Sequence, residues 1–592
     1  MPSPIDLIFT WLRHKRAASS KPVAPEHTKR EKHFFQTLHA GRRFPTLGQW
    51  RHVPLVLNKK ERVVFWSAFW VLIASVCILL IGWYASHLVF GPAQGGVYTE
   101  GLIGSPQFVN PLYAQGNDVD QDIARLVYSG LMQWHPTEGL ITDMAESYTI
   151  SDDQRVYAFT LRDDASWHDG TPVTVRDVIF TFNAIQNPEF KSPLSSAFRG
   201  VTIEQIDDRS VAFTLGDPFA PFLAAFTVGL LPAEQWGDLD PATARLAERN
   251  LAPIGSGPYA FKEFTKDKRG AIQSYTLERY DHYYGGAPHI ETIEFKMYPS
   301  LPELLLALEN RNIEGAAFVP KSQLERFGSS TYQIANPHLP QVTALFFNVK
   351  HEYVEDARVR RALSAAIDKE ALVERVLYGY GTVAHSLLLQ GSLEEPIVNP
   401  VGFDPDMARA LLEEVGFDDE TRLPLTLTTV EQDETVLTAE AIADMWRAVG
   451  VDVTVKTVDP ALFREEVLKD RSYDILLSGT LYGIDPDPYP FWHSSQASHP
   501  GLNLSQYANR DIDKKIEEAR TLSDRDERTR LYREVAESVN GALPAIFLYQ
   551  PTYSYVTSSR IRGIALDSIV VPADRFGQAH EWFVKAKQQF QW

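Results

Sequence analysis

One uninterrupted apolar run constrains this chain more than any other feature. Residues 63–90 are 28 positions without a single Asp, Glu, Lys or Arg. An α-helix needs about 20 apolar residues to cross the hydrocarbon of a bilayer, so we expect a transmembrane helix over 63–90. Trp66, Trp70, Trp83 and Tyr84 lie within the run as possible anchors at the membrane interface.

The charge of the chain reverses across this run. Residues 1–62 carry 13 Lys+Arg against 4 Asp+Glu, a balance of +9. The whole chain carries −19, so residues 91–592 must carry −28. Because basic segments tend to stay on the cytoplasmic side, we expect residues 1–62 to be a basic cytoplasmic arm. The 502 residues after the run then lie outside the cell membrane.

A cleaved secretory signal is the alternative interpretation of the run. Such a signal has an apolar core of about 7–15 residues behind a short basic leader, whereas this leader has 62 residues. The only cysteine, Cys77, lies in mid-span, where we interpret it as a small apolar filler rather than a lipidation site. The outer part has no thiol, so its stability must come from core burial and not from disulfides.

The composition of the outer part disfavours several classes of protein. A balance of −28 argues against nucleic acid as a partner, because phosphates would be repelled. The motifs of zinc proteases, nucleophile-elbow hydrolases and phosphate-binding loops are missing from the sequence. His282 and His289 are seven residues apart, a spacing that places two metal ligands together on neither a helix nor a strand. We therefore expect no enzyme activity, no metal site and no cofactor.

Strand and helix signals alternate along the outer part. Residues 97–101 and 156–161 alternate bulky side chains as half-buried strands do. Thr174 and Asp177 have the spacing of a capping box before a helix over 175–185. Capping signals predict helices that begin at Asp356, Asp368 and Asp404. A helix–turn–strand unit is predicted from Ala439 to Val455, and a strand over 473–477. A long helix or helix pair is predicted over 511–540. This alternation favours an α/β fold with mixed sheets.

Several short strings occur in an order that resembles a known family. They are Asn110–Tyr113, Ile123–Leu131, Trp167–Thr174 completed by Asp177 and Val178, Gly255–Tyr259, Phe347-Asn348, Val359–Leu363 and Ala366–Asp368. Together they are similar to the peptide-type extracellular solute-binding proteins of ABC transporters, the family of oligopeptide, dipeptide and nickel receptors. The resemblance covers about residues 97–570.

The resemblance implies a two-lobed, three-domain clamp of the periplasmic-binding-protein type, preceded by one transmembrane helix. The implied division is 91–126 with 236–342 and 550–592 for the core domain of lobe I, 127–235 for its accessory domain, and 343–549 for lobe II. Ligand would lie between the lobes, which close on it by a hinge motion. Gly255 and Gly257 are expected to let the backbone bend where the chain recrosses between lobes.

The segment 483–492 is the first candidate for ligand contact. In peptide receptors of the family, an aspartate four positions before the corresponding proline pairs with the amino terminus of the peptide. Counted back from Pro488, that position holds Ile484. Asp485 and Asp487 lie close by, and a buried ammonium needs a carboxylate. A turn with a helix-capping acid is an equally open interpretation.

Other candidates for ligand contact come from several parts of the chain: the loop Tyr113, Gln115, Gly116 and Asn117, together with Tyr128, Asn348 and Trp492. Aromatic side chains with one polar end suit a site that grips varied ligands. Packing inside the fold is the alternative for each of them.

The resemblance and the apolar run together predict a function. We expect a single-pass receptor in the cell membrane that captures a peptide or similar small solute and delivers it to ABC permease subunits. The lipid bilayer would hold it through residues 63–90. A receptor or scaffold of the same fold without a transport role stays open, and a hydrolase is disfavoured by the missing motifs.

Overall fold

The computed structural model describes residues 57–86, 88–389, 401–418, 420–522 and 524–590, and most of the predicted basic arm lies outside them. The described chain divides into a unit that contains the first helix and a unit that runs from Pro92 to Ala586. Each unit is described by itself below. A small two-stranded sheet pairs β1 (Leu88–Ala93) with β21 (Lys585–Phe590).

The apolar run forms a helix whose bounds differ from the predicted 63–90. Helix α5 extends over Lys59–Ser86. It begins earlier because the amide of Glu61 donates to the Asn58 side chain at 3.2 Å, while the Asn58 amide donates to the Glu61 carboxylate at 3.2 Å. At the other end the chain leaves the helix at Ser86, so the last apolar residues of the run belong to β1.

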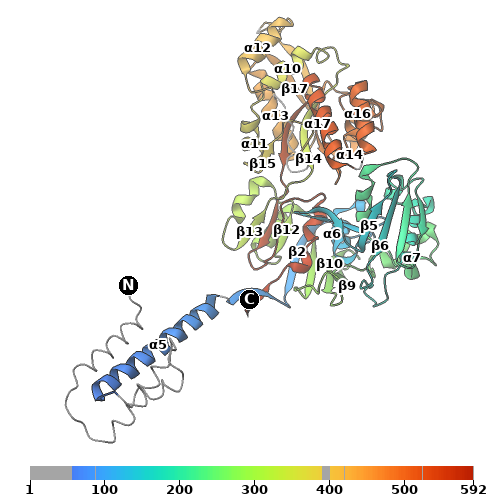
Figure 1. Ribbon diagram of the computed structural model, residues 1–592. Coiled ribbons are helices and arrows are strands. Elements are labelled where there is room, and N and C mark those ends of the chain that lie inside the picture. Colours follow the sequence, from blue (N-terminus) through green and yellow to red (C-terminus); the bar gives the residue numbers. More distant parts are fainter. Residues whose placement is uncertain (1–56, 87, 390–400, 419, 523, 591–592) are drawn as a thin grey trace, which may run out of the picture. The chain divides into compact units, whose positions relative to one another are not determined.

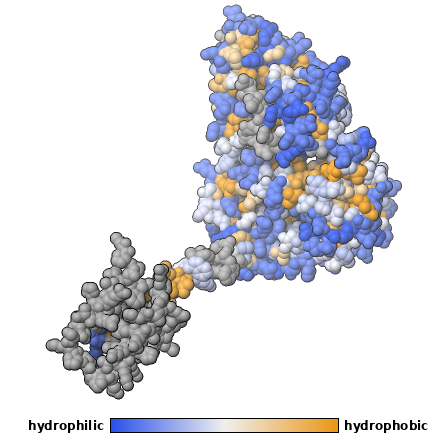
Figure 2. Space-filling view, in the orientation of Figure 1, coloured by the Kyte–Doolittle hydropathy of each residue, from blue (hydrophilic) through white to orange (hydrophobic). Residues whose placement is uncertain are grey.

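The side chains of α5 are predominantly apolar, as in a membrane-spanning helix. Between Lys59 and Tyr84 its mean hydropathy reaches 2.5, and the segment is long and apolar enough to cross a membrane. Most of its large apolar side chains are exposed. Most of α5 is covered in Figure 2, and the parts that are visible are an orange stretch and a small blue one.

Lobe I, as we name it, has two main sheets and a small two-stranded one. Its larger, mixed sheet has seven strands in the order β13-β20-β12-β2-β11-β10-β9. Strand β2 lies near the middle and runs parallel to both of its neighbours. The bounds are β2 Val97–Ile103, β9 Tyr259–Lys266, β10 Ile272–Arg279, β11 Thr292–Tyr298, β12 Gly315–Ala317, β13 Tyr332–Ala335 and β20 Tyr555–Ser558. Figure 1 shows blue, green and red segments meeting here, so three distant stretches of chain build this sheet.

The second sheet of lobe I is antiparallel, with four strands in the order β5-β6-β8-β7. Its helix α7 (Val175–Gln186) confirms the predicted helix, and the capping box of Thr174 and Asp177 is present. The other elements of lobe I are β3 Met132–His135, β4 Gly139–Thr142, β5 Ala145–Ile150, β6 Val156–Leu161, β7 Thr202–Gln205, β8 Ser210–Thr214, α6 Asp118–Val127, α8 Ala233–Trp236 and α9 Leu301–Glu309.

Lobe II is continuous in sequence and has one mixed sheet, with six strands in the order β15-β19-β14-β18-β16-β17. Helices α10 to α13 pack with one apolar cluster of this lobe, and α16 and α17 with another. The elements are β14 Gln341–Phe347, α10 Ala357–Ala365, α11 Lys369–Leu377, β15 Gly381–Val383, α12 Pro405–Glu414, β16 Leu423–Val430, α13 Asp433–Arg447, β17 Val451–Val458, α14 Pro460–Phe463, β18 Ile475–Leu481, α15 Tyr489–Trp492, α16 Arg510–Arg520, α17 Arg525–Ala542 and β19 Ala545–Pro551. The helices predicted to open at Asp356, Asp368 and Asp404 are confirmed, each with that aspartate as cap.

Two segments carry the chain between the lobes and lie side by side. The first is 336–340, between β13 and β14, and the second is 552–554, between β19 and β20. The amide of Tyr553 donates to the carbonyl of Pro337 at 2.9 Å. The mixed α/β fold is thus confirmed, whereas the exact boundaries of the three domains stay a prediction.

Two of the short sequence motifs pack against each other inside lobe I. The Gly255 amide donates to His168 Nδ1 at 3.1 Å, and His168 Nε2 lies 3.0 Å from the carbonyl of Gly257. Because Nδ1 accepts, the ring proton is on Nε2 and donates to Gly257. A Cβ at Gly255 would lie 1.9 Å from the carbonyl oxygen of Val127, so only glycine fits.

The expectation that these glycines mark a crossing between lobes is wrong. They lie where the chain returns from the four-stranded sheet to β9, and both sheets belong to lobe I. Their role is close approach to the end of α6, as the clash of a Cβ with Val127 shows. The crossings use segments 336–340 and 552–554 instead.

A buried ion cluster joins the two ends of lobe I. The guanidinium of Arg575 is fully buried and makes a bidentate pair with Asp122 on α6, at 2.6 and 2.5 Å. It also donates to Glu100 on β2 at 2.7 Å. The hydroxyls of Tyr98 and Tyr555 donate to the other oxygen of Glu100 at 2.6 and 2.7 Å. Burial raises the pKa of Asp122 to about 6, although the adjacent guanidinium opposes this.

Titration of His168 gives the first prediction. Burial lowers the pKa of His168 to about 4 from its ordinary 6.5. The unfolded chain therefore takes up this proton first, and the stabilisation by neutral His168 is lost as the pH falls from about 6.5 to about 4. His168→Asn keeps a hydrogen-bond acceptor but does not titrate. We expect it to cost about 2 kcal/mol at neutral pH and to approach wild type in stability as the pH falls through this window.

Urea unfolding of both proteins across this pH range measures the difference directly. Other titrating groups affect both proteins alike and cancel in the comparison. A stability gap that stays constant with pH would contradict the assignment of a neutral, hydrogen-bonded His168.

Candidate functional site

The loop that follows β18 brings Asp485 and Asp487 together, each with an arginine. Asp485 Oδ2 lies 3.0 Å from Arg528 Nη2 on α17, and Asp487 Oδ2 lies 3.0 Å from Arg520 Nε on α16. The amide of Tyr489, the first residue of α15, donates to Asp487 Oδ1 at 3.0 Å. The capping alternative therefore applies to Asp487, whereas Asp485 makes no such contact in the part of the chain that the structure describes.

Both carboxyl groups are perturbed by burial. Burial raises the pKa of Asp485 and of Asp487, while the arginine that each contacts acts in the opposite direction. The second oxygen of Asp485, Oδ1, is buried and has no hydrogen-bond partner among the described residues. A ligand ammonium that reached this oxygen would supply its missing partner.

The arginine partners were missed by the sequence reasoning. Arg520 and Arg528 are eight residues apart but lie on two separate helices, as the last residue of α16 and an early residue of α17. The sequence predicted a charged helix or helix pair there, which is correct. It held no signal for the pairing with residues 485 and 487, because that pairing depends on how the helices dock on the sheet.

Side chains from both lobes meet beside this loop. The Arg520 Cζ lies 4.1 Å from the ring centroid of Tyr489 in lobe II and 4.8 Å from that of Phe219 in lobe I. Elsewhere, Lys321 of lobe I forms an ion pair of 3.1 Å with Glu434 of lobe II. The two lobes are therefore in contact in this structure.

The predicted contact loop of lobe I lies at the start of α6. Asn117 caps this helix by accepting from the Val119 amide at 3.1 Å, while Gln115 and Gly116 are exposed. Tyr113 is buried, and its hydroxyl has no partner among the described residues. The loop thus presents Gln115 and Gly116 to solvent, and Asn117 serves the helix.

The remaining candidates are held in the interior or in local hydrogen bonds. Tyr128 is 4% exposed and Trp492 is 2% exposed, and Trp492 packs against Phe346 and Phe547. Asn348 donates to the carbonyl of Tyr473 at 3.1 Å and accepts from Gln506 at 2.9 Å. These contacts favour the packing alternative for all three, and their contact with a ligand stays a prediction.

Asn348 belongs to a separate hollow of lobe II, at the end of β14 opposite to the crossing segments. This cavity of about 460 Å³ is lined by Asn348, His351, Thr426, Thr428, Lys456 and residues 471–474. Asp474 accepts from the Thr426 amide at 2.8 Å and lies 3.2 Å from His351 Nε2. Three buried atoms of its lining residues, His351 Nδ1, Thr428 Oγ1 and Arg471 Nε, have no hydrogen-bond partner among the described residues. The lining comes from lobe II alone, so the cavity is not our candidate for a site between the lobes.

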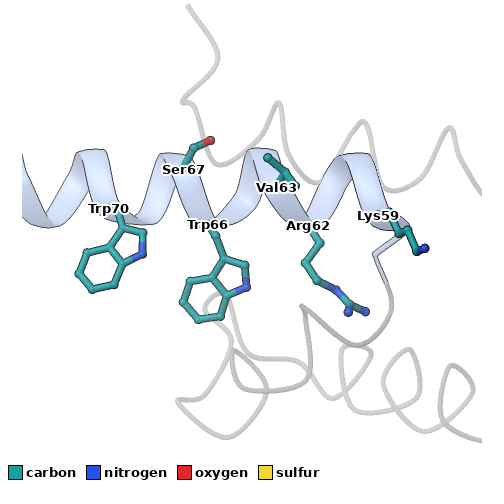
Figure 3. Close-up of a pocket in the computed structure, with 6 residues that line it drawn as sticks. All are labelled: Lys59, Arg62, Val63, Trp66, Ser67 and Trp70. Atoms are coloured by element: carbon teal, nitrogen blue, oxygen red, sulfur yellow. The ribbon is translucent and has the colours of Figure 1, made fainter.

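Figure 3 shows a second hollow, along α5. Lys59, Arg62, Val63, Trp66, Ser67 and Trp70 line it, and Arg62, Trp66 and Trp70 project from the same side of the helix. This arrangement places indole rings next to basic groups at the N-terminal end of the helix. In the part of the chain that the structure describes, no three His, Cys, Asp or Glu side chains are grouped as metal ligands would be.

The sequence of this chain matches the model of one protein family. The family model described as bacterial extracellular solute-binding proteins, family 5, middle, matches residues 139–501. The oligopeptide-binding protein AppA of Bacillus subtilis is 27% identical over 497 residues, which are 80% of this chain and 89% of that protein.

Two solved structures are similar over most of this chain. The substrate-binding protein CtaP of Listeria monocytogenes superposes with a TM-score of 0.74 at 25% identity, covering 83% of this chain and 100% of CtaP. NikZ of Campylobacter jejuni, solved with Ni(L-His), superposes with a TM-score of 0.67 at 25% identity, covering 82% and 99% of the two chains.

The pairing of Asp485 with Arg528 gives the second prediction. Both side chains are mostly buried, at 13% and 18% exposed. Asp485→Asn should cost about 3 kcal/mol of unfolding free energy, because it leaves a buried guanidinium without its counter-charge. The double variant with Arg528→Gln should cost less than the sum of the two single changes.

Chemical unfolding of the four proteins measures the coupling energy. Arg530 and Glu534 are a matched control pair on the surface of α17, for which we expect a coupling of about 0.5 kcal/mol or less. Equal coupling in the two cycles would mean that the Asp485 pair is no more than a surface ion pair.

Proposed function

Because the chain belongs to the bacterial extracellular solute-binding proteins of family 5, we propose that it is a membrane-anchored receptor that captures a peptide between its lobes and delivers it to an ABC permease. The observation that carries the proposal is the loop with Asp485 and Asp487 beside the contact between lobes. Proteins of this family bind substrates, and the proposal contains no catalytic step.

The charges around this loop suit a zwitterionic ligand. Two carboxylates and two guanidinium groups lie within one small region, and Asp485 Oδ1 is free to accept. An ammonium group can bind the carboxylates, while a ligand carboxylate can approach the arginines. The exposed Gln115 and Gly116 of lobe I are proposed as further contacts with the body of the ligand.

The name of AppA, an oligopeptide-binding protein, supports a peptide as ligand. The nickel–histidine complex bound by NikZ shows that related folds accept other small solutes. For this chain we propose a peptide, because a free amino terminus matches the buried carboxylate oxygen.

We further propose that α5 anchors the receptor in the cell membrane, with residues 1–56 in the cytoplasm and the unit from Pro92 outside. The length and hydropathy of α5 support this. Lys59 and Arg62 at its N-terminal end give the expected cytoplasmic side. The anchor would keep the receptor close to a permease in the same membrane, which raises their effective concentration.

Peptide binding is the third prediction. A library of tripeptides, with free and with N-acetylated amino termini, is titrated against the full-length protein in detergent. Acetylation should weaken binding by about tenfold or more, because it removes a charge-assisted hydrogen bond. In Asp485→Asn the same acetylation should change the affinity little, while Asp238→Asn, at an exposed carboxylate of lobe I, should behave as wild type.

If Asp487→Asn alone abolishes the effect of acetylation, Asp487 binds the ammonium and Asp485 does not. If no tripeptide binds, the proposal of a peptide receptor is wrong and the receptor or scaffold without transport role is favoured.

Membrane topology is the fourth prediction, and the single cysteine makes it simple to test. With Cys77 replaced by alanine, a membrane-impermeant maleimide should label Lys268→Cys in cells or spheroplasts whose inner membrane is intact. Lys29→Cys, in the basic arm, should react only after that membrane is opened. Labelling in the reverse order would contradict the proposed orientation.

A further inference from the structure

Arg520 touches both lobes at once. Its guanidinium lies between the ring of Tyr489, at 4.1 Å from the centroid, and the ring of Phe219, at 4.8 Å. Its Nε is 3.0 Å from Asp487 Oδ2, so the positive charge has a counter-charge in lobe II. A guanidinium is weakly hydrated and planar, and it stacks on aromatic faces better than an ammonium does.

Each of the two rings is fixed to the core of its own lobe. Phe219 packs against the apolar core of lobe I, and its carbonyl accepts from the Tyr157 hydroxyl at 3.0 Å. Tyr489 packs against the core of lobe II, and its amide donates to Asp487. When the lobes separate, Arg520 therefore keeps Tyr489 and Asp487 and loses only Phe219.

We propose that the contact of Arg520 with Phe219 is a latch that holds the lobes closed in the absence of ligand. No ligand atom takes part in this contact, since all its groups belong to the chain. Opening exposes the Phe219 ring and one face of the guanidinium to water. The ion pair of Lys321 with Glu434 also joins the lobes, but it exchanges for water more cheaply because Glu434 is 38% exposed.

The latch predicts that the empty receptor exists mainly in the closed state. Removing one cation–ring contact should lower the ratio of closed to open molecules by roughly fivefold to thirtyfold. This inference concerns the ligand-free protein, so it stands or fails independently of which solute binds.

Distance measurement between the lobes tests the latch. The full-length chain in detergent carries Cys77→Ala and nitroxide labels at Asp208→Cys in the four-stranded sheet region and Asp470→Cys in lobe II, both exposed positions. Double electron–electron resonance then gives the populations of short and long distances. The series compares the labelled protein with Phe219→Leu, Arg520→Leu and the double variant.

We expect the long-distance population to grow in Phe219→Leu and in Arg520→Leu, and the double variant to resemble the single ones because both changes remove the same contact. Phe219→Leu leaves the pair of Arg520 with Asp487 intact, so it separates the latch from any loss of folding. Arg530→Leu, at an arginine paired only within α17, should leave the distribution unchanged.

The proposal is overturned if Phe219→Leu leaves the distance distribution unchanged. It is also overturned if the double variant shows the sum of the two single effects, or if Arg530→Leu opens the lobes equally.

Discussion

The buried guanidinium of Arg575 is the interaction on which the rest of lobe I depends. It joins β2 through Glu100 and α6 through Asp122, although Arg575 itself lies near the end of the chain. Two carboxylates share one guanidinium in the interior, so the cluster keeps a net negative charge, which two tyrosine hydroxyls help to disperse. Such a cluster adds little net stability over an apolar core, but loss of one member leaves a buried charge without a partner. It therefore specifies which segments meet.

The same logic recurs at the loop of lobe II in a looser form. Asp485 and Asp487 face arginines as the carboxylates around Arg575 do, but here the side chains are partly open to solvent. Asp485 Oδ1 is nevertheless buried, and it has no hydrogen-bond partner among the described residues. A cluster in which every charged group has a protein partner joins the segments of the fold. A cluster at the boundary between lobes in which one acceptor lacks a partner can bind a ligand group. Burial separates the two cases, since Arg575 has no exposed surface at all.

The sequence predicted what local patterns control. Caps at Thr174, Asp356 and Asp368 needed only neighbours two or three residues away, and the structure confirms them. The mixed α/β fold and the helix pair at 510–542 also follow from the patterns. The bounds of α5 were missed because the Asn58 cap draws charged residues into the helix. The sequence could not predict that Arg528 and Phe219 lie near the loop with Asp485 and Asp487, because only the packing of distant segments brings them there. The role of Gly255 was predicted wrongly for the same reason.

The order of strands along the chain has a consequence for how the protein is made. Lobe II takes its sheet from one continuous stretch, whereas lobe I needs strands from three stretches and the late Arg575. A chain that is synthesised from its N-terminus therefore presents a complete lobe II while lobe I still lacks β20 and the guanidinium that pairs with Glu100 and Asp122. During this interval the partly built lobe I exposes β2 and an uncompensated pair of acids, and it is the part of the nascent protein most in need of protection from aggregation.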